Sequence, residues 1–254
     1  MLVVISPAKR MNEGAGEGPD LQTLPRFATE AAELATVARG LDAAALQQLM
    51  HLSPALAQLN AGRFAAFAAD PAPGQAQAAV TLFAGDTYAG LEARTLDADA
   101  QHWAQGRLRI LSGLYGLLRP YDAIQPHRLE MGTRLQNAQG PTLYAFWGSR
   151  IAQALNADAT TVGAAVLVNC ASVEYFSAVD RAALRPEVVT PVFMEDREAG
   201  PKVISFHAKK ARGAMARFIV ENRIESPRAL AEFDAGGYVY QPAMSIPDRP
   251  VFLR

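Results

Sequence analysis

The decisive stretch of this sequence reads Lys202-Val-Ile-Ser-Phe-His-Ala-Lys-Lys-Ala-Arg-Gly-Ala-Met-Ala-Arg-Phe-Ile-Val-Glu-Asn-Arg223. Its first apolar residues, Val203, Ile204 and Phe206, predict a short buried strand. The apolar residues that follow recur at helical spacing, namely Ala208, Ala211, Met215, Phe218 and Ile219. This spacing predicts a helix with one apolar face. The stretch therefore predicts a strand that leads directly into an amphipathic helix.

The same stretch concentrates positive charge. Its basic residues are Lys202, Lys209, Lys210, Arg212, Arg217 and Arg223, and Glu221 is its only acidic residue. The whole chain has a formal net charge of -1, so the remainder is net acidic. A short basic element in a nearly neutral chain creates a local field that attracts polyanions. The alternative is a solvated helix face without a partner, which is the commoner role of a basic helix.

The composition indicates an ordinary globular protein. Its 254 residues are 50% apolar and 19% charged, which is enough material for a full hydrophobic core. Cys170 is the only cysteine, which excludes an intramolecular disulfide and favours a reducing compartment. The N-terminal apolar run is short and is interrupted by Pro7, unlike a signal peptide. No segment has the length of a membrane span. We therefore expect a cytoplasmic protein with no membrane partner.

Strands are predicted at both ends of the chain, with helices between them. The predicted strands are 2–5, 165–170, 188–194, 202–206, 238–240 and 251–253. The predicted helical regions are 27–69 and 75–118, the second interrupted near 85–90, and the breaker 70–74 separates them. The first strand has no natural partner except the late strands, and no long linker divides the chain. We therefore predict an α/β fold of mixed α+β character, in one integrated domain that spans residues 1–254.

A segment at about 42–63 is similar to a helix-hairpin-helix, the motif that binds DNA without sequence preference. Asp42 is a predicted N-cap of the first helix. Ser53 is expected to cap the second helix, and Pro54 fits its first position.

The hairpin of this segment departs from the usual motif. Leu52 occupies the apolar hairpin position, but His51 and Ser53 stand where the motif has glycines. Free amides at the start of the second helix, near Ala55, would still receive a phosphate, and Arg63 would add a charge. An ordinary helical corner is the alternative, and the sequence alone does not separate the two.

Residues 107–134 are the best candidate for an enzyme site. The segment gathers Arg107, Arg109, Arg119, Asp122, His127, Arg128, Glu130 and Arg134 around predicted turns. Asp122 or Glu130 would act as a base, with the arginines as an anion clamp. Arginine–carboxylate pairs that fix loops are the commoner alternative, and a second phosphate-binding surface is a third. Lys9 follows the first strand, and strand ends frequently line sites in α/β proteins.

Other candidate chemistry is weaker. The sequence Gly14-Ala-Gly16-Glu-Gly18 lacks the spacing of a dinucleotide-binding loop, and no Walker A sequence is present. Cys170 lies in the most apolar predicted strand, where a thiol is usually a small buried hydrophobe. The four histidines do not fall at metal-ligand spacing. The sequence therefore predicts no cofactor and no metal site, and it identifies no catalytic residue.

Several blocks together resemble the bacterial peroxide stress resistance protein YaaA family. They are Val4-Ile-Ser-Pro-Ala-Lys9, Ser112-Gly-Leu-Tyr-Gly-Leu-Leu-Arg-Pro120, Arg128-Leu-Glu-Met-Gly132, Leu143-Tyr-Ala-Phe-Trp-Gly148, Ala171-Ser-Val-Glu-Tyr-Phe176 and Ile204-Ser-Phe-His-Ala-Lys-Lys-Ala-Arg-Gly213. The resemblance covers essentially the whole chain. It implies a cytoplasmic protein of the oxidative stress response that lowers free intracellular iron and limits oxidative DNA damage.

The same resemblance implies a fold peculiar to the family, with a helix-hairpin-helix, a positively charged cleft and DNA binding without marked sequence preference. Family members commonly have leucine where this chain has Cys170, which argues against a catalytic thiol. The family offers no established catalytic residues to carry over.

These observations lead to one main hypothesis, a DNA-binding protein that protects DNA under peroxide stress. The residues expected to contact duplex or distorted DNA are His51, Leu52, Ser53, Ala55, Arg63, Arg119, Arg128, Arg134, Lys209, Lys210, Arg212 and Arg217. The alternative is an enzyme for a phosphorylated or otherwise anionic small molecule, with Lys9 and Glu130 in the cleft beside Arg128. Direct iron sequestration is disfavoured because ligand clusters are missing, and no oligomeric state is predicted.

Overall fold

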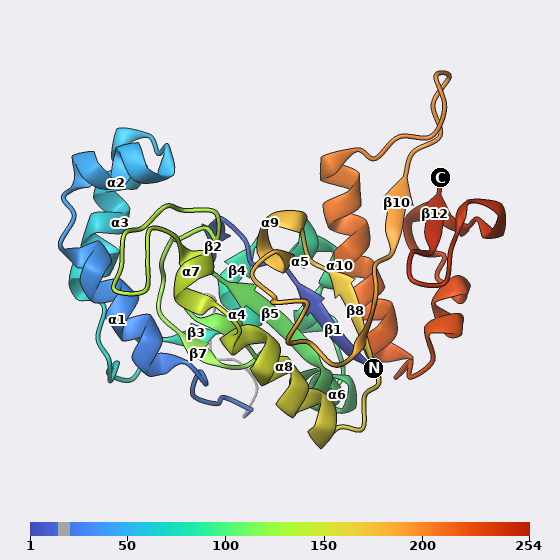
Figure 1. Ribbon diagram of the computed structural model, residues 1–254, viewed down its shortest axis with the longest axis horizontal. Helices are drawn as coiled ribbons and strands as arrows, with labels where there is room; N and C mark the ends of the chain where they lie inside the picture. The colour runs from blue at the N-terminus through green and yellow to red at the C-terminus, as the bar shows by residue number, and fades with distance from the viewer. Residues whose placement is uncertain (15–20) are drawn as a thin grey trace.

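A five-stranded sheet forms the centre of the structure, a computed structural model that describes residues 1–14 and 21–254 (Figure 1). Its strands lie in the order β6-β5-β1-β8-β9. They are β1 (Leu2–Ile5), β5 (Leu108–Ser112), β6 (Gly116–Leu118), β8 (Val166–Cys170) and β9 (Glu187–Val189). β5, β1, β8 and β9 run parallel, and β6 is antiparallel to β5.

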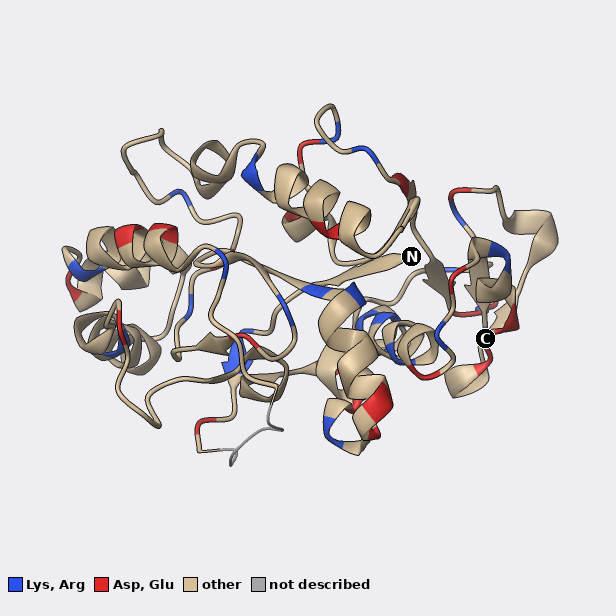
Figure 2. Ribbon diagram, turned by 90° about the horizontal axis from the view of Figure 1, so that it is seen from below, with Lys and Arg blue, Asp and Glu red and all other residues tan. Residues whose placement is uncertain are grey.

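Helices cover both faces of this sheet. Every residue of β1 is buried, as a central strand of a parallel sheet requires. Helix α8 (Arg150–Thr161) lies on one face, and α10 (Ser205–Glu221) and α6 (Ala98–Arg107) lie on the other (Figures 1 and 2). Because α10 also contacts β1 and β8 directly, its position relative to the sheet is fixed.

Two glycines allow α10 to approach helix α5 (Asp86–Leu91) very closely. A Cβ on Gly213 would lie 1.8 Å from the carbonyl oxygen of Thr87, and one on Gly90 would lie 2.0 Å from that of Lys210. No side chain fits in either place, so the backbones themselves are in contact. This contact sets the rotation of α10 and the directions in which its basic side chains point.

Three helices form one end of the molecule (Figure 1). They are α1 (Ala28–Arg39), α2 (Ala43–Met50) and α3 (Pro54–Ala66), as the Ala- and Leu-rich composition predicts. The breaker at 70–74 contains no helix or strand. The prediction of successive short helices in 27–69 is therefore confirmed.

A small sheet forms the opposite end. It has the order β10-β12-β11, made of β10 (Val192–Met194), β12 (Val251–Leu253) and β11 (Val239–Tyr240). Aromatic rings hold it together, since Phe193 stacks on Phe252 with a centroid distance of 5.4 Å and meets Tyr238 edge-on at 5.3 Å. The 3-10 helices η2 (Pro227–Glu232) and η3 (Ala235–Gly237) lie between α10 and β11, and η4 (Pro242–Met244) lies between β11 and β12.

The other elements are short. They are β2 (Arg10–Met11), β3 (Gln77–Ala78), α4 (Ala79–Leu82), β4 (Phe83–Ala84), η1 (Ala93–Thr95), β7 (Ala123–Ile124), α7 (Leu143–Trp147) and α9 (Val173–Phe176). Within the described ranges, no helix is both long and apolar enough to cross a membrane. Most of the glycine-rich segment that begins at Gly14 lies outside the described residues.

The predicted strands at 2–5, 165–170, 238–240 and 251–253 are confirmed, with bounds that differ by a residue at most. The predicted strand 188–194 divides into β9 and β10, which belong to different sheets. Pro191 lies between them and has no amide to continue a ladder. The mixed α/β class is therefore confirmed, with one predicted strand serving two sheets.

Two predictions about the elements are wrong. Residues 202–206 form no strand, because only Lys202 makes a bridge, to Glu195, and α10 already begins at Ser205. Val203 and Phe206 are 45% and 57% exposed rather than buried.

The second error concerns residues 108–118, which are strands β5 and β6 rather than helix. As a result β1 pairs with β5 from the middle of the chain as well as with β8, and not only with late strands. The predicted interruption near 85–90 is in fact helix α5, whose Gly90 serves helix contact rather than a break.

The backbone contact between α5 and α10 predicts a large cost for adding a methyl group at Gly213. Gly213→Ala is expected to lower the free energy of unfolding by about 2 kcal/mol or more, because the two helices must separate. Gly62→Ala in α3 is the control, since a Cβ there meets nothing within 4 Å. This control is expected to be neutral or stabilising by roughly 1 kcal/mol. Urea denaturation measures both, and equal stabilities for the two variants would contradict the close contact.

Candidate functional site

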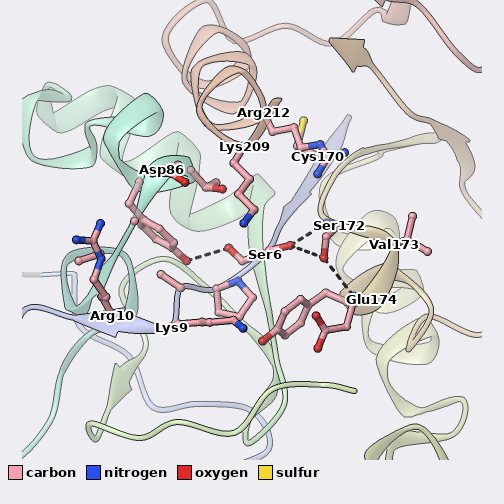
Figure 3. Close-up of a pocket in the computed structure, with 17 residues that line it drawn as sticks. Ser6, Lys9, Arg10, Asp86, Cys170, Ser172, Val173, Glu174, Lys209 and Arg212 are labelled. Carbon is pink, nitrogen blue, oxygen red and sulfur yellow. Dashed lines mark hydrogen bonds between the residues drawn. The ribbon is translucent and has the colours of Figure 1, made fainter. Parts of the chain in front are cut away.

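A pocket of about 490 Å³ opens at the carboxyl ends of β1 and β8 (Figure 3). From β1 the main sheet continues to β5 on one side, and from β8 it continues to β9 on the other. The connections thus leave in opposite directions at β1 and β8. Open α/β sheets bind their ligands at such a point, in the crevice outside the carboxyl ends of the strands.

Two serines form the floor of this pocket. Ser6 follows β1, and Ser172 follows β8. The Ser172 amide donates to the Ser6 hydroxyl at 2.8 Å, and the two hydroxyl oxygens are 3.4 Å apart. The buried Tyr88 hydroxyl donates to the Ser6 carbonyl at 3.2 Å. These bonds tie the two strand ends into one rigid surface.

Helix α10 supplies the cationic wall. Lys209 reaches from the helix toward Ser6, and the guanidinium of Arg212 lies beside Cys170 (Figure 3). Arg212 is half-buried, and this burial lowers the pKa of its guanidinium. Among the described residues, no carboxylate or other acceptor is paired with the charged group of either residue. Both charges are therefore available to an anion.

A closed network of charges forms the opposite rim. The carboxylate of Glu130 forms ion pairs with the ammonium group of Lys9 at 3.0 Å and with the guanidinium of Arg128 at 2.8 Å. The sequence groups these three residues in one cleft, and the structure does bring them together. Lys9 lines the pocket, whereas Glu130 is already held by two cations. Nearby, Glu174 accepts from the amide of Gly132 at 2.9 Å.

Cys170 lines the pocket as a buried thiol. Burial raises the pKa of this thiol to about 12, although the neighbouring Arg212 acts in the opposite direction. The expected buried position is confirmed. Because the thiolate is the reactive form, Cys170 is a poor nucleophile here.

The basic residues of α10 do not share one surface. Lys210 and Arg217 line a second pocket, with Tyr238 and Arg254 on its other side. Arg217 is fully engaged, because its guanidinium donates to the carbonyls of Leu91 and Glu92, to Thr95 and to Glu221. Arg217 therefore fastens the end of α5 to α10.

The segment at 42–63 forms two helices joined by a tight turn. Asp42 caps α2 by accepting from the Ala45 amide at 2.8 Å, and Ser53 caps α3 by accepting from Leu56 at 3.4 Å. His51 is exposed and has left-handed backbone angles (φ 52°), the conformation for which the motif uses glycine.

Other residues of this segment are less free to meet a ligand. Leu52 is buried beneath the turn, and Ala55 is exposed in the first turn of α3. Arg63 pairs with Glu13 and with Asn60. Figure 1 places α2 and α3 at one end of the molecule, with the central sheet between them and α10. This arrangement does not show that the turn binds DNA. It also does not place the basic residues in a single cleft.

The arginines of 107–134 have mixed roles. Arg109 is buried and pairs with Asp158 at 2.6 Å, so it supports the fold. Asp122 is buried and holds a turn by accepting from the Arg119 amide at 2.8 Å and from Thr23. Arg119 and Arg134 are exposed. In the described part of the chain, no group of three or more His, Cys, Asp or Glu side chains is placed to hold a metal ion.

The sequence indicates Lys9 and the basic helix as parts of a functional site, but it gives no such indication for the two serines. Ser6 comes directly after one predicted strand and Ser172 two positions after another, so position was the available signal. Their meeting depends on the pairing of β1 with β8, in which Ile5 lies opposite Cys170.

The fold and the site define a mixed α/β protein with a pocket, lined by several basic residues, where the strand order reverses. Comparison with known proteins identifies its family. The model of the peroxide stress protein YaaA family matches residues 1–244, and the chain belongs to this family.

Close relatives carry the name UPF0246 protein. One from Cereibacter sphaeroides (strain ATCC 17025) is 61% identical over 259 residues, covering 100% of this chain and 99% of the relative. One from Roseobacter denitrificans is 56% identical over 256 residues, covering 100% and 98%. The family resemblance of the sequence is therefore confirmed.

The burial of Cys170 predicts an unreactive thiol in the folded protein. A pKa of about 12 leaves a thiolate population roughly a thousandfold smaller than in the unfolded chain at neutral pH. Iodoacetamide is therefore expected to alkylate Cys170 rapidly in urea and very slowly in buffer, as mass spectrometry would show. Equal rates in the two conditions would mean that the thiol is exposed in the native state.

Proposed function

We propose that this protein binds DNA in the cytoplasm during the response to peroxide, and so limits oxidative DNA damage. The observation that carries the proposal is the set of cations on the first half of α10, the exposed Lys209 and Lys210 beside the half-buried Arg212. The family supports the setting, since its model bears the name of a peroxide stress protein. A phosphate backbone is a polyanion long enough to contact cations on both of these neighbouring faces of α10.

The contacts available to DNA are fewer than the sequence suggests. Arg217 and Arg63 already have intramolecular partners, and Arg128 is held by Glu130. The proposal therefore rests on Lys209, Lys210 and Arg212. His51, Ser53 and the Ala55 amide of the hairpin, and the exposed Arg119 and Arg134, are proposed as outlying phosphate contacts.

Lower free iron is proposed as a consequence of this role rather than of iron binding. The described residues offer no cluster of metal-ligating side chains that would sequester the metal. We therefore do not assign Glu130 or the buried His127 as iron ligands.

A second candidate function is an enzyme or binding protein for a phosphorylated or anionic small molecule. The observation that favours it is the enclosed pocket at the point where the strand order reverses. Glu130 is less suited to act as its base than the sequence suggests, because it is bound by two cations.

The DNA-binding proposal predicts a strong dependence on salt and on α10. Lys209→Glu/Lys210→Glu is expected to weaken binding to a duplex sharply and to reduce the log–log salt slope by about 0.9 for each phosphate that is no longer neutralised. Lys210→Glu alone and Arg228→Glu form the matched pair, because each changes the net charge equally and Arg228 is exposed but lies beyond the opposite end of α10. Fluorescence anisotropy at several salt concentrations measures these effects.

Two results would contradict the proposal. The first is an affinity that hardly changes with salt, which would exclude counterion release. The second is an equal weakening in the Arg228 variant, which would show that only net charge matters. If binding survives the α10 variants and Glu130→Gln impairs turnover of an anionic substrate, the second candidate is correct.

A further inference from the structure

We propose that the pocket between β1 and β8 is a specific site for a terminal phosphate group, held by Arg212, Lys209, Ser6 and Ser172. This inference rests on the second candidate function and names the chemical class of its ligand. It concerns one phosphate with two negative charges, as on a phosphate monoester. The internal phosphodiesters of DNA carry one charge each.

The charge of the pocket fits a dianion. Four basic and two acidic residues line it, which gives a net charge of +2. The acidic residues are Asp86 and Glu174, and Glu174 is partly committed to the Gly132 amide. Arg10 lies at the rim and turns away (Figure 3), and Lys9 is paired with Glu130. Arg10 has no described partner either, so the unpaired cations that face into the pocket are Lys209 and Arg212, which lie one turn apart on α10 on the same side.

The guanidinium of Arg212 is the strongest part of the site. Partial burial removes part of the solvation of this charge, although its N–H groups still reach solvent in the pocket. A guanidinium offers two parallel N–H groups that match two phosphate oxygens. A bound phosphate would therefore supply the acceptor that the protein itself does not provide among its described residues.

The serine floor supplies a neutral donor. Two hydroxyl groups carry two hydrogens, and the single bond between Ser6 and Ser172 uses one of them. The other is free to donate to a phosphate oxygen. Because the Ser172 amide and Tyr88 hold Ser6 in place, this donor needs no rearrangement when the ligand binds.

The pocket also has room for more than phosphate. Its volume of about 490 Å³ lies in the range of small-molecule sites, and Pro7, Tyr88, Val173 and Tyr175 line its less polar part. The ligand is therefore a phosphate attached to a larger group. Both a small phosphate monoester and the phosphorylated end of a nucleic-acid strand have this chemistry.

Calorimetric titration of the full-length protein tests the proposal with inorganic phosphate, AMP and adenosine as probes. We expect saturable 1:1 binding of AMP, weaker binding of phosphate and no binding of adenosine. Lys209→Ala and Arg212→Ala are each expected to weaken AMP binding at least about tenfold, because each removes a charge-assisted hydrogen bond. Arg212→Lys retains the charge but lacks the two parallel N–H groups of the guanidinium, so we expect it to bind AMP with intermediate affinity. Arg228→Ala, outside the pocket, is the control.

The source of the phosphate is tested separately. A short single-stranded oligonucleotide is compared with and without a 5′-phosphate, in the presence and absence of AMP. Preference for the phosphorylated strand, with competition by AMP, assigns the site to strand ends. Binding of AMP without such preference assigns it to a small molecule.

Three outcomes would overturn the proposal: no binding of AMP or phosphate, equal binding of adenosine and AMP, or unchanged AMP affinity in the Lys209 variant. Lys209 is exposed, so its variant is expected to fold even if Arg212→Ala does not. Melting temperatures without ligand check this. Duplex and AMP affinities are also measured on Lys210→Glu, a residue outside this pocket, whose loss of duplex binding with unchanged AMP binding separates the DNA-binding proposal from the phosphate site.

Discussion

The parallel pairing of β1 with β8 is the constraint on which the rest of the structure depends. It brings Ser6 and Ser172, which are 166 positions apart in the sequence, to the same edge of the sheet, where they share a hydrogen bond. The buried apolar run of β1 forces this pairing, because a strand covered on both faces must find backbone partners on both edges. Once β1 lies between β5 and β8, the reversal of strand order creates the crevice. The pocket therefore follows from the strand order of the sheet and does not depend on any one side chain.

The contact between α5 and α10 decides which charges face that crevice. In the sequence, the basic residues of α10 form one group. In the structure the glycine contact fixes the helix rotation, so Lys209 and Arg212 face one pocket while Lys210 and Arg217 face another. Successive residues of a helix point about 100° apart, so neighbouring lysines serve different surfaces. A basic helix is thus better described by its faces than by its total charge.

The sequence predicts some of this well and some of it poorly, for physical reasons. β1 is predictable because its four apolar residues leave no helical alternative. β5 is not, because its second residue, Arg109, looks like a surface charge and is neutralised by Asp158, a partner 49 residues later. In the same way, Val203 and Phe206 are apolar without being buried, so an apolar run alone predicts a strand wrongly. The roles of Arg217 and Arg63 depend on partners that no local pattern reveals.

The position of Arg212 bears on stability as well as function. Half-burial removes part of the solvation of this cation, although its N–H groups still reach solvent, and an apolar side chain would avoid that cost. Proteins commonly accept such a cost at sites where a ligand supplies the missing partner. The serine pair beside it points the same way, because a packed core would leave no hydroxyl hydrogen unused. A surface that attracts DNA needs exposed charges such as Lys210, whereas a cation withdrawn into a pocket suits a single group that enters it. The two proposals therefore share Lys209 and Arg212, whereas Lys210 belongs to the DNA-binding proposal alone, and a strand that carries a terminal phosphate would use all three.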